Sequence, residues 1–417
     1  MKTKLAYFKT PFWAWIGFLA MFAAAGAVAG ILVFWKGLSL TNLSDLVPWG
    51  LWITIDLSSI ALSAGAFMLS AVVYLVGIKK LQPIARTAVF IGLIGYTMAL
   101  ITLLMDIGRP DRFWHAMVFW NPHSVLWEVT MCVALYLTVL VLEVLPIVGE
   151  ADWFQARFPK IAPKLEHIHK FAPILAIAGL GFSLLHQSSL GATYGVLKAR
   201  PIWYRPGLSV LFMLSAMVAG PSLTVLASML VGWLKPDARV QDDLLETVSH
   251  FVGWSLAAYL YFRFWDAFAM TYTYQPGRNE ALSALTSGPF AFNFWIGEIL
   301  VGAVIPLILL LNPKTRKNKL WRAMALAFVV GGLVAYRWDI NLVGQVVLAA
   351  NLPQGITPLF TEYFPSLIEF LVGFGVIAYG LIAFSLGVKF LNIVDHPPMR
   401  EEVHSHAGSV IPVAAGD

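Results

Sequence analysis

Long apolar runs alternate with short polar segments along the whole chain of 417 residues. A helix needs about 20 mostly apolar residues to cross a hydrocarbon core roughly 30 Å thick. By that measure the pattern predicts ten transmembrane helices, at residues 12–35, 51–78, 84–107, 124–148, 171–190, 208–233, 247–270, 290–312, 319–336 and 366–391. The segments between them are too short for a soluble domain, so we predict a single, all-α, polytopic membrane domain over residues 1–417.

Composition supports this class and narrows the chemistry. The chain is 59% hydrophobic and 12% charged, whereas soluble domains carry about 25% charged residues. The net charge of +5 falls in segments beside the predicted helices and gives no indication of nucleic-acid binding. The single cysteine, Cys132, excludes an internal disulfide and a cysteine-ligated iron–sulfur cluster in this chain.

Lysine and arginine residues are unevenly shared between the two sides of the predicted bundle. Most of them fall in the N-terminal segment, the segments around Lys79, Arg157, Lys235 and Arg316, and the tail. Cytoplasmic segments of membrane proteins are enriched in these residues. We therefore predict that both termini face the cytoplasm, and we call the opposite side the outer side.

Ionisable residues within the predicted spans gather near the outer side. Each costs on the order of 2.5–3.5 kcal/mol in a membrane helix, so such residues are usually functional. They must face a protein interior, and one polar chamber near the outer surface would accommodate all of them. The set comprises Asp56, Asp106, Glu128, His186, Arg263, Asp266 and Glu298.

Two interpretations of these residues stay open. Arg263 can form an ion pair with Asp266 or Glu298 between helices, which would be a packing role. The acids near His186 have no buried lysine or arginine partner in the same four spans, and only Arg109, just past Asp106, could neutralise one of them. Unpaired acids around a histidine favour proton transfer.

The candidate ligand of this chamber follows from its side chains. A b-type haem needs axial ligands such as a pair of deep histidines, and the sequence predicts only one, His186, while no cluster of metal ligands is present. A quinone needs an apolar slot with aromatic walls, one or two hydrogen-bonding groups and a proton donor. The predicted polar end is Asp106, His186, Gln187, Ser188 and Ser189, and the predicted wall residues are Trp49, Trp52 and Phe67.

Three stretches resemble a known family. They are "PWGLWITIDLSSIALSAGAF" (48–67), "LLMDIGRPDRFWHAMVFWNPHSVLWE" (103–128) and "LLHQSSLGATYG" (184–195). The chain resembles the NrfD/PsrC-type quinone-interacting membrane subunits, in particular the ten-span branch with the HybB-type hydrogenase subunit and the QrcD-type menaquinone reductase subunit. The likeness is strong over about residues 45–205 and weaker beyond.

The resemblance implies two four-helix bundles, flanked by the first and last helices, in a bacterial inner membrane. It implies a haem-free subunit that binds menaquinone or ubiquinone near the periplasmic face and exchanges electrons with a periplasmic iron–sulfur subunit and further periplasmic redox subunits. The implied quinone-pocket residues are Asp106, Arg109, His186 and Gln187–Ser189, and the implied proton-route residues are Asp56, Glu128, Glu298, Asp266 and Arg263.

The outer segments 106–124 and 190–207, rich in Trp, Tyr, Arg and Pro, are either an interfacial aromatic belt or a platform for that partner. We predict quinone reduction with proton uptake, and the reverse direction stays open. The inner half shows no comparable chain of acids, which favours protons from the periplasm. The alternatives are a secondary transporter or ion translocator, and an anchor without its own quinone site.

Overall fold

The structure, a computed structural model, describes residues 10–74, 77–235, 240–273, 275–347, 360–391 and 393. The described part is helical, with one isolated bridge between Val347 and Phe360. Among its helices, eight are long and apolar enough to cross a membrane. The predicted spans 51–78 and 247–270 correspond to two further elements, the broken helix α2–α3 and helix α11. The prediction of an all-α, multi-pass membrane protein is confirmed.

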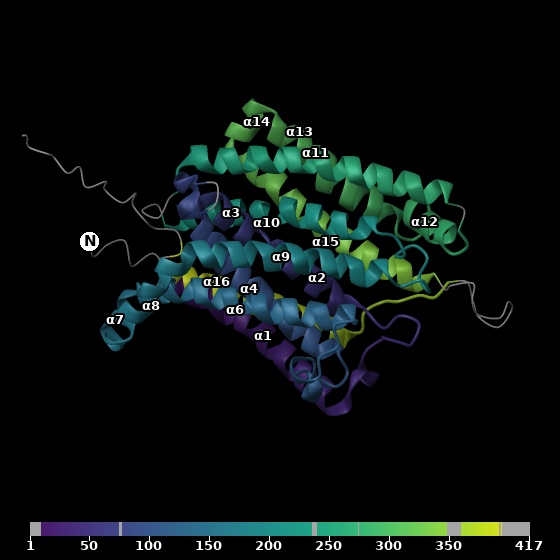
Figure 1. Cartoon of the computed structure of the whole chain (residues 1–417), viewed down its shortest axis with the longest axis horizontal. Coiled ribbons are helices and arrows are strands. Elements are labelled where there is room, and N and C mark those ends of the chain that lie inside the picture. Colours follow the sequence, from purple (N-terminus) through teal and green to yellow (C-terminus); the bar gives the residue numbers. More distant parts are fainter. Residues whose placement is uncertain are drawn as a thin grey trace, which may run out of the picture.

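The long helices follow one another in alternating directions (Figure 1). They are α1 (Thr10–Lys36), α2 (Leu51–Ser63), α3 (Gly65–Tyr74), α4 (Gln82–Asp106), α6 (Val125–Gly149), α9 (Ala172–Gly195), α10 (Gly207–Leu234), α11 (Asp242–Tyr272), the π-helix η7 (Asn293–Val304) continued by α13 (Ile305–Leu311), α15 (Lys319–Val346) and α16 (Leu367–Phe390).

Short helices fill the connections. They are η2 (Leu38–Leu40), η3 (Lys79–Leu81), η4 (Pro110–Arg112), α5 (His115–Val118), α7 (Asp152–Arg157), α8 (Ala162–Glu166), η5 (His167–Phe171), α12 (Arg278–Thr286) and α14 (Pro313–Lys317). Polar residues fix where several long helices begin. The Ser124 hydroxyl accepts a hydrogen bond from Trp127 N at the start of α6, and Ser366 and Glu369 form a capping box on α16.

Two helices extend well beyond their predicted ends. Helix α9 continues to Gly195 rather than stopping at 190, and α15 continues to Val346 rather than 336. Both extensions contain polar residues that lower the hydropathy, which is why the predicted spans were too short. These residues are buried against other helices, as at Arg337 and Asn341. Arg337, which follows the predicted end at residue 336, therefore lies inside α15.

The helices pack as two four-helix bundles and one flanking pair. Helices α2–α3, α4, α6 and α9 form the first bundle, and α10, α11, η7–α13 and α15 form the second. Helix α10 packs against α9, α2 and α3 and so joins the two bundles, while α1 packs along α16. In Figure 1 the second bundle lies toward the top and the α1–α16 side toward the bottom.

Small residues let the bundles approach closely. A Cβ on Gly65 of α3 would lie 2.3 Å from the carbonyl carbon of Gly220 on α10, so only glycine fits there. Gly26 of α1 meets Gly375 of α16 in the same way, at 2.6 Å. Close backbone contact of this kind is the usual way in which membrane helices associate. We call the end of the bundles near Asp106 the outer end, and the opposite end the inner end.

Candidate functional site

A cavity of about 360 Å³ lies in the outer half of the first bundle. Volumes of roughly 300–1,000 Å³ are typical of small-molecule sites. Most of its walls are apolar, with three aromatic residues, Trp49, Tyr96 and Tyr194. The complete lining is Trp49, Ile53, Asp56, Leu57, Ile60, Tyr96, Ala99, Leu100, Leu103, Asp106, Ile107, Leu126, Val129, Val133, His186, Leu190, Thr193 and Tyr194.

His186 is the central polar group of this cavity. It is fully buried, and its Nδ1 forms a hydrogen bond with the hydroxyl of Tyr96. The Tyr96 ring is held in turn against Tyr136, with ring centroids 4.3 Å apart. The His186 Nε2 has no hydrogen-bond partner among the described residues. When the Tyr96 hydroxyl donates to Nδ1, Nε2 carries the ring proton and can donate it to a ligand oxygen.

Two carboxyl groups share the cavity with His186. Asp56 of α2 is buried, and Asp106 ends α4 with an Oδ1 that has no hydrogen-bond partner in the described part of the chain. No lysine or arginine belongs to the lining. Two acids and an imidazole without a neighbouring cation are groups that can give up and accept protons. The described residues contain no group of three or more His, Cys, Asp or Glu side chains that could hold a metal ion.

The polar residues after His186 support α9 rather than line the cavity. The Gln187 amide donates to the Ile60 carbonyl at 3.1 Å and ties α9 to α2. The Ser189 hydroxyl donates to Glu128 Oε1 at 2.9 Å and ties α9 to α6. The Ser188 hydroxyl donates to the Leu185 carbonyl of its own helix. Because α9 continues to Gly195, His186 lies about 13 Å below its outer end, deeper than the single turn that the sequence predicted.

Of the predicted wall residues, the structure places one in the cavity. Trp49 lines it, whereas Trp52 packs toward α16 and its Nε1 donates to the Glu369 carbonyl at 3.0 Å. Phe67 belongs to α3, and its side chain lies outside the described residues.

Arg109 is exposed on the outer segment and does not line the cavity. Its guanidinium pairs with Asp111 at 3.0 Å rather than with Asp106. The hydrogen bond from Arg109 lowers the pKa of Asp111 below its usual value. The same segment, residues 107–123, exposes several aromatic side chains, namely Phe113, Trp114, Phe119 and Trp120.

The other predicted platform is packed against the protein. In the segment after α9, Trp203 is buried and donates to the Ile340 carbonyl at 2.6 Å. Arg200 donates to the carbonyls of Gln345 and Leu46, each at 3.0 Å. Among the described residues, the 107–123 segment therefore exposes several aromatic side chains, whereas Tyr204 is the one exposed aromatic residue in the segment after α9.

Arg263, Asp266 and Glu298 lie in the second bundle, not in one chamber with His186. Arg263 Nε lies 2.7 Å from Glu298 Oε1, which also accepts a hydrogen bond from Tyr259 at 2.7 Å. Asp266 is bound by Arg263 at 3.2 Å and by Arg205 at 2.6 Å. The interhelical ion pair, one of the two interpretations left open by the sequence, is thus present. The cavity beside Glu298 measures about 20 Å³, room for about one water molecule.

Several site residues were missed in the sequence. Tyr96 and Tyr194 are uncharged and gave no signal in an apolar pattern, yet both line the cavity. Tyr194 donates to Asn341 Oδ1 at 3.1 Å, and the Asn341 amide donates to the carbonyls of Trp49 and Gly50. Asn341 thus links α15 of the second bundle to the wall of the cavity.

Comparison with known proteins extends over nearly the whole chain. Residues 39–349 match the family described as "Polysulphide reductase, NrfD". The menaquinone reductase integral membrane subunit of Nitratidesulfovibrio vulgaris is 32% identical over 394 residues, 92% of each chain. The probable Ni/Fe-hydrogenase 2 b-type cytochrome subunit of Escherichia coli is 26% identical over 90% of each. The Hdr-like menaquinol oxidoreductase integral membrane subunit of Archaeoglobus fulgidus is 24% identical over 94% of this chain and 96% of its own.

Proposed function

The chain belongs to the NrfD family, as a membrane subunit of a respiratory oxidoreductase complex, and we propose that it binds menaquinone or ubiquinone in the His186 cavity. Its relatives include a menaquinone reductase subunit. The observation that carries the proposal is the His186 Nε2, a buried donor without a partner among the described residues, at the wall of a mostly apolar 360 Å³ cavity. A quinone carbonyl is the acceptor that such a group requires, and the apolar walls suit its ring and tail.

In this site His186 orients the quinone and Asp106 transfers protons. Nε2 donates to one carbonyl oxygen, while the Tyr96 hydroxyl on Nδ1 fixes the plane of the imidazole. Asp106 is the other residue of the cavity lining with a buried atom that lacks a partner among the described residues, and we assign to it the proton exchange with the reduced oxygen. Asp56 lines the same cavity, and we assign to it proton exchange with Asp106.

Histidine placement favours a quinone over haem. His186 is buried, whereas His123, His167, His169 and His250 are exposed and His115 is half-buried. Bis-histidine ligation of haem needs two deep histidines on facing helices, and the described residues offer one.

Electrons reach the site from a partner on the outer face. We assign docking of a periplasmic iron–sulfur subunit to the 107–123 segment, because its exposed aromatic side chains and charged residues lie next to Asp106 in the chain. This orientation places both termini in the cytoplasm of a bacterium and the chain in its inner membrane, in agreement with the basic residues of the inner segments. Further periplasmic redox subunits would complete the complex.

A titration with a fluorescent quinone-site inhibitor tests the proposal on the purified complex. Wild type should bind one inhibitor per subunit, and His186→Ala should bind at least about tenfold more weakly, which corresponds to about 1.4 kcal/mol. Ser188→Ala is the matched control, because Ser188 lies on the same helix and bonds only within it. Equal binding by wild type and His186→Ala would place the quinone elsewhere, and no binding by wild type would favour a transporter or an anchor.

A further inference from the structure

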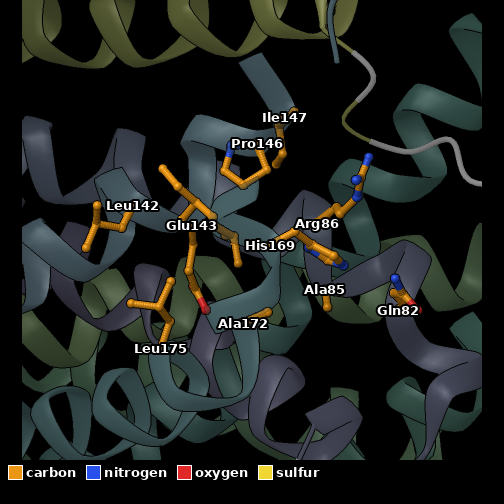
Figure 2. A pocket seen from close by; sticks show the side chains of 12 residues that line it. Gln82, Ala85, Arg86, Leu142, Glu143, Pro146, Ile147, His169, Ala172 and Leu175 are labelled. Carbon is orange, nitrogen blue, oxygen red and sulfur yellow. The ribbon is translucent and has the colours of Figure 1, made fainter. Parts of the chain in front are cut away.

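A further cavity, of about 50 Å³, lies at the inner end of the first bundle and is lined by an acidic residue. Helices α4, α6, η5 and α9 form it, and Figure 2 shows Glu143 of α6 among its lining residues. The Glu143 Oε2 is buried and has no hydrogen-bond partner among the described residues. A carboxyl group in a membrane helix costs free energy, so such groups are usually functional. The sequence indicates no chain of acids in the inner half comparable to that of the outer half, and Glu143 is a single acid there.

Among the residues that the structure describes, the charged groups around this cavity leave Glu143 without a counterion. Arg86 lines the cavity, but its guanidinium makes a two-fold hydrogen bond with Glu150, at 2.7 and 2.8 Å. His169 of η5 also lines the cavity and is exposed to solvent. The lining residues from α9, Ala172 and Leu175, are apolar. The arrangement connects solvent, through His169, to a carboxyl group that Arg86 does not neutralise.

Titratable side chains continue from this acid toward His186. Tyr136, which is fully buried, precedes Glu143 by two turns of α6, about 10 Å along the axis. Ser183 of α9 is also buried. The Tyr136 ring packs on Tyr96, which is bonded to His186 Nδ1. Hydroxyl groups therefore lie between the Glu143 cavity and the His186 cavity.

We propose that Glu143 takes up protons at the inner end and supplies them, past Tyr136 and Tyr96, to the His186 cavity. This inference rests on the proposed function. Reduction of one quinone to quinol consumes two electrons, from the one-electron carrier of the partner subunit, and two protons. Both protons come from the inner aqueous phase, and Glu143 is reprotonated from that phase through His169 after each transfer. Electrons and protons thus arrive from opposite sides of the membrane.

Proteoliposomes that contain the whole complex, with its outer face outward and pyranine trapped inside, test this assignment. Reduced benzyl viologen is added outside as the electron source, and 2,3-dimethyl-1,4-naphthoquinone serves as the quinone. In wild type the interior should become alkaline, with two protons lost per quinone reduced. In Glu143→Gln the rate of this alkalinisation should fall at least about tenfold, and Glu143→Asp should retain part of it.

The matched control is Glu166→Gln, because Glu166 of α8 lies at the same end, accepts a hydrogen bond from Gln155 at 3.1 Å and does not line the cavity. It should keep the wild-type rate. Binding of the quinone-site inhibitor by Glu143→Gln should stay at the wild-type level, which shows that the variant is folded.

Two results would overturn the inference while the proposed function stands. One is wild-type alkalinisation by Glu143→Gln, and the other is proton uptake from the outside by wild type. Failure of wild type to bind or reduce the quinone would instead contradict the proposed function itself.

Discussion

The two bundles share an architecture, but the Arg263 network of the second bundle and the His186 cavity of the first treat their buried polar groups in opposite ways. In the second bundle, Arg263 is bound to Glu298 and Asp266, and the adjoining cavity measures about 20 Å³. In the first bundle, His186 and Asp106 each keep an atom without a partner among the described residues, beside a cavity of about 360 Å³. A buried ion pair is costly to break by removal of one partner, whereas polar groups without partners around an open cavity are available to a ligand. Whether a charged residue in a membrane helix has a structural or a ligand-binding role therefore depends on its hydrogen-bond and ion-pair partners.

The largest effect should come from breaking the paired network. Arg263→Met leaves the buried Glu298 carboxylate with the Tyr259 hydroxyl as its remaining partner, and removal of one member of a buried pair costs about 3–5 kcal/mol. Thermal unfolding of the purified complex should show a large loss of stability, while His186→Ala should lose much less. The double variant Arg263→Met/Glu298→Leu should recover part of the loss. A larger loss for His186→Ala would reverse the comparison.

The next largest effect should come from enlarging a side chain, which should affect stability differently in the two bundles. Ala303→Leu forces a larger side chain beside the 20 Å³ space, and overpacking costs about 1–3 kcal/mol. Ala99→Leu, in the wall of the 360 Å³ cavity, has room. It should keep the thermal stability and weaken inhibitor binding. Equal destabilisation by both substitutions would indicate that the first cavity does not accept a side chain of this size.

A smaller effect is expected when the orientation of His186 is loosened. Tyr96→Phe removes the hydroxyl on Nδ1 and keeps the ring that packs on Tyr136. One hydrogen bond contributes about 0.5–1.5 kcal/mol, so inhibitor affinity should fall about two- to tenfold. The titration used for His186→Ala measures it, and an affinity equal to wild type would show that Tyr96 does not position the imidazole.

The smallest effect is expected at Arg109, which the sequence assigned to the quinone pocket. Its guanidinium is exposed and paired with Asp111, so Arg109→Gln should change inhibitor affinity by less than about twofold. Because the pKa of Asp111 is lowered, the pair persists from neutral pH to below the ordinary aspartate value of about 3.9 and is lost as pH falls through the lowered pKa. Inhibitor binding between pH 6 and 8, about two units or more above that value, should not depend on this pair. A tenfold loss in Arg109→Gln would place Arg109 in the site.

Apolar patterning predicted the helices well and their polar ends poorly. The ranges of α1, α4 and α16 differ from the predicted spans by one or two residues at each end. Helices α9 and α15 were cut short, because polar residues that face another helix have the same hydropathy as residues in a loop. Whether such a residue belongs to a helix or a loop depends on its packing against other helices, which the hydropathy of a sequence window does not report.

The site was predicted in part for the same reason. Asp56, Asp106 and His186 were found because charge in a span is rare, and the structure places all three at one cavity. Tyr96 was missed, since its hydroxyl is unremarkable in an aromatic-rich chain. Glu143 lies within the predicted span 124–148 and was not predicted as a site residue, because it is a single acid in an apolar segment. Gln187 and Ser189 were assigned to the ligand, yet they hold α9 against its neighbours.

Photoaffinity labelling tests the central claim, quinone binding at the His186 cavity, most directly. The intact complex is irradiated with an azido-naphthoquinone, and the modified residues are mapped by mass spectrometry. We predict adducts on α2, α4, α6 and α9 at residues of the 360 Å³ cavity, reduced by competing menaquinone and by His186→Ala. Adducts confined to α10, α11 or α15, with the first bundle unmodified, would contradict the account.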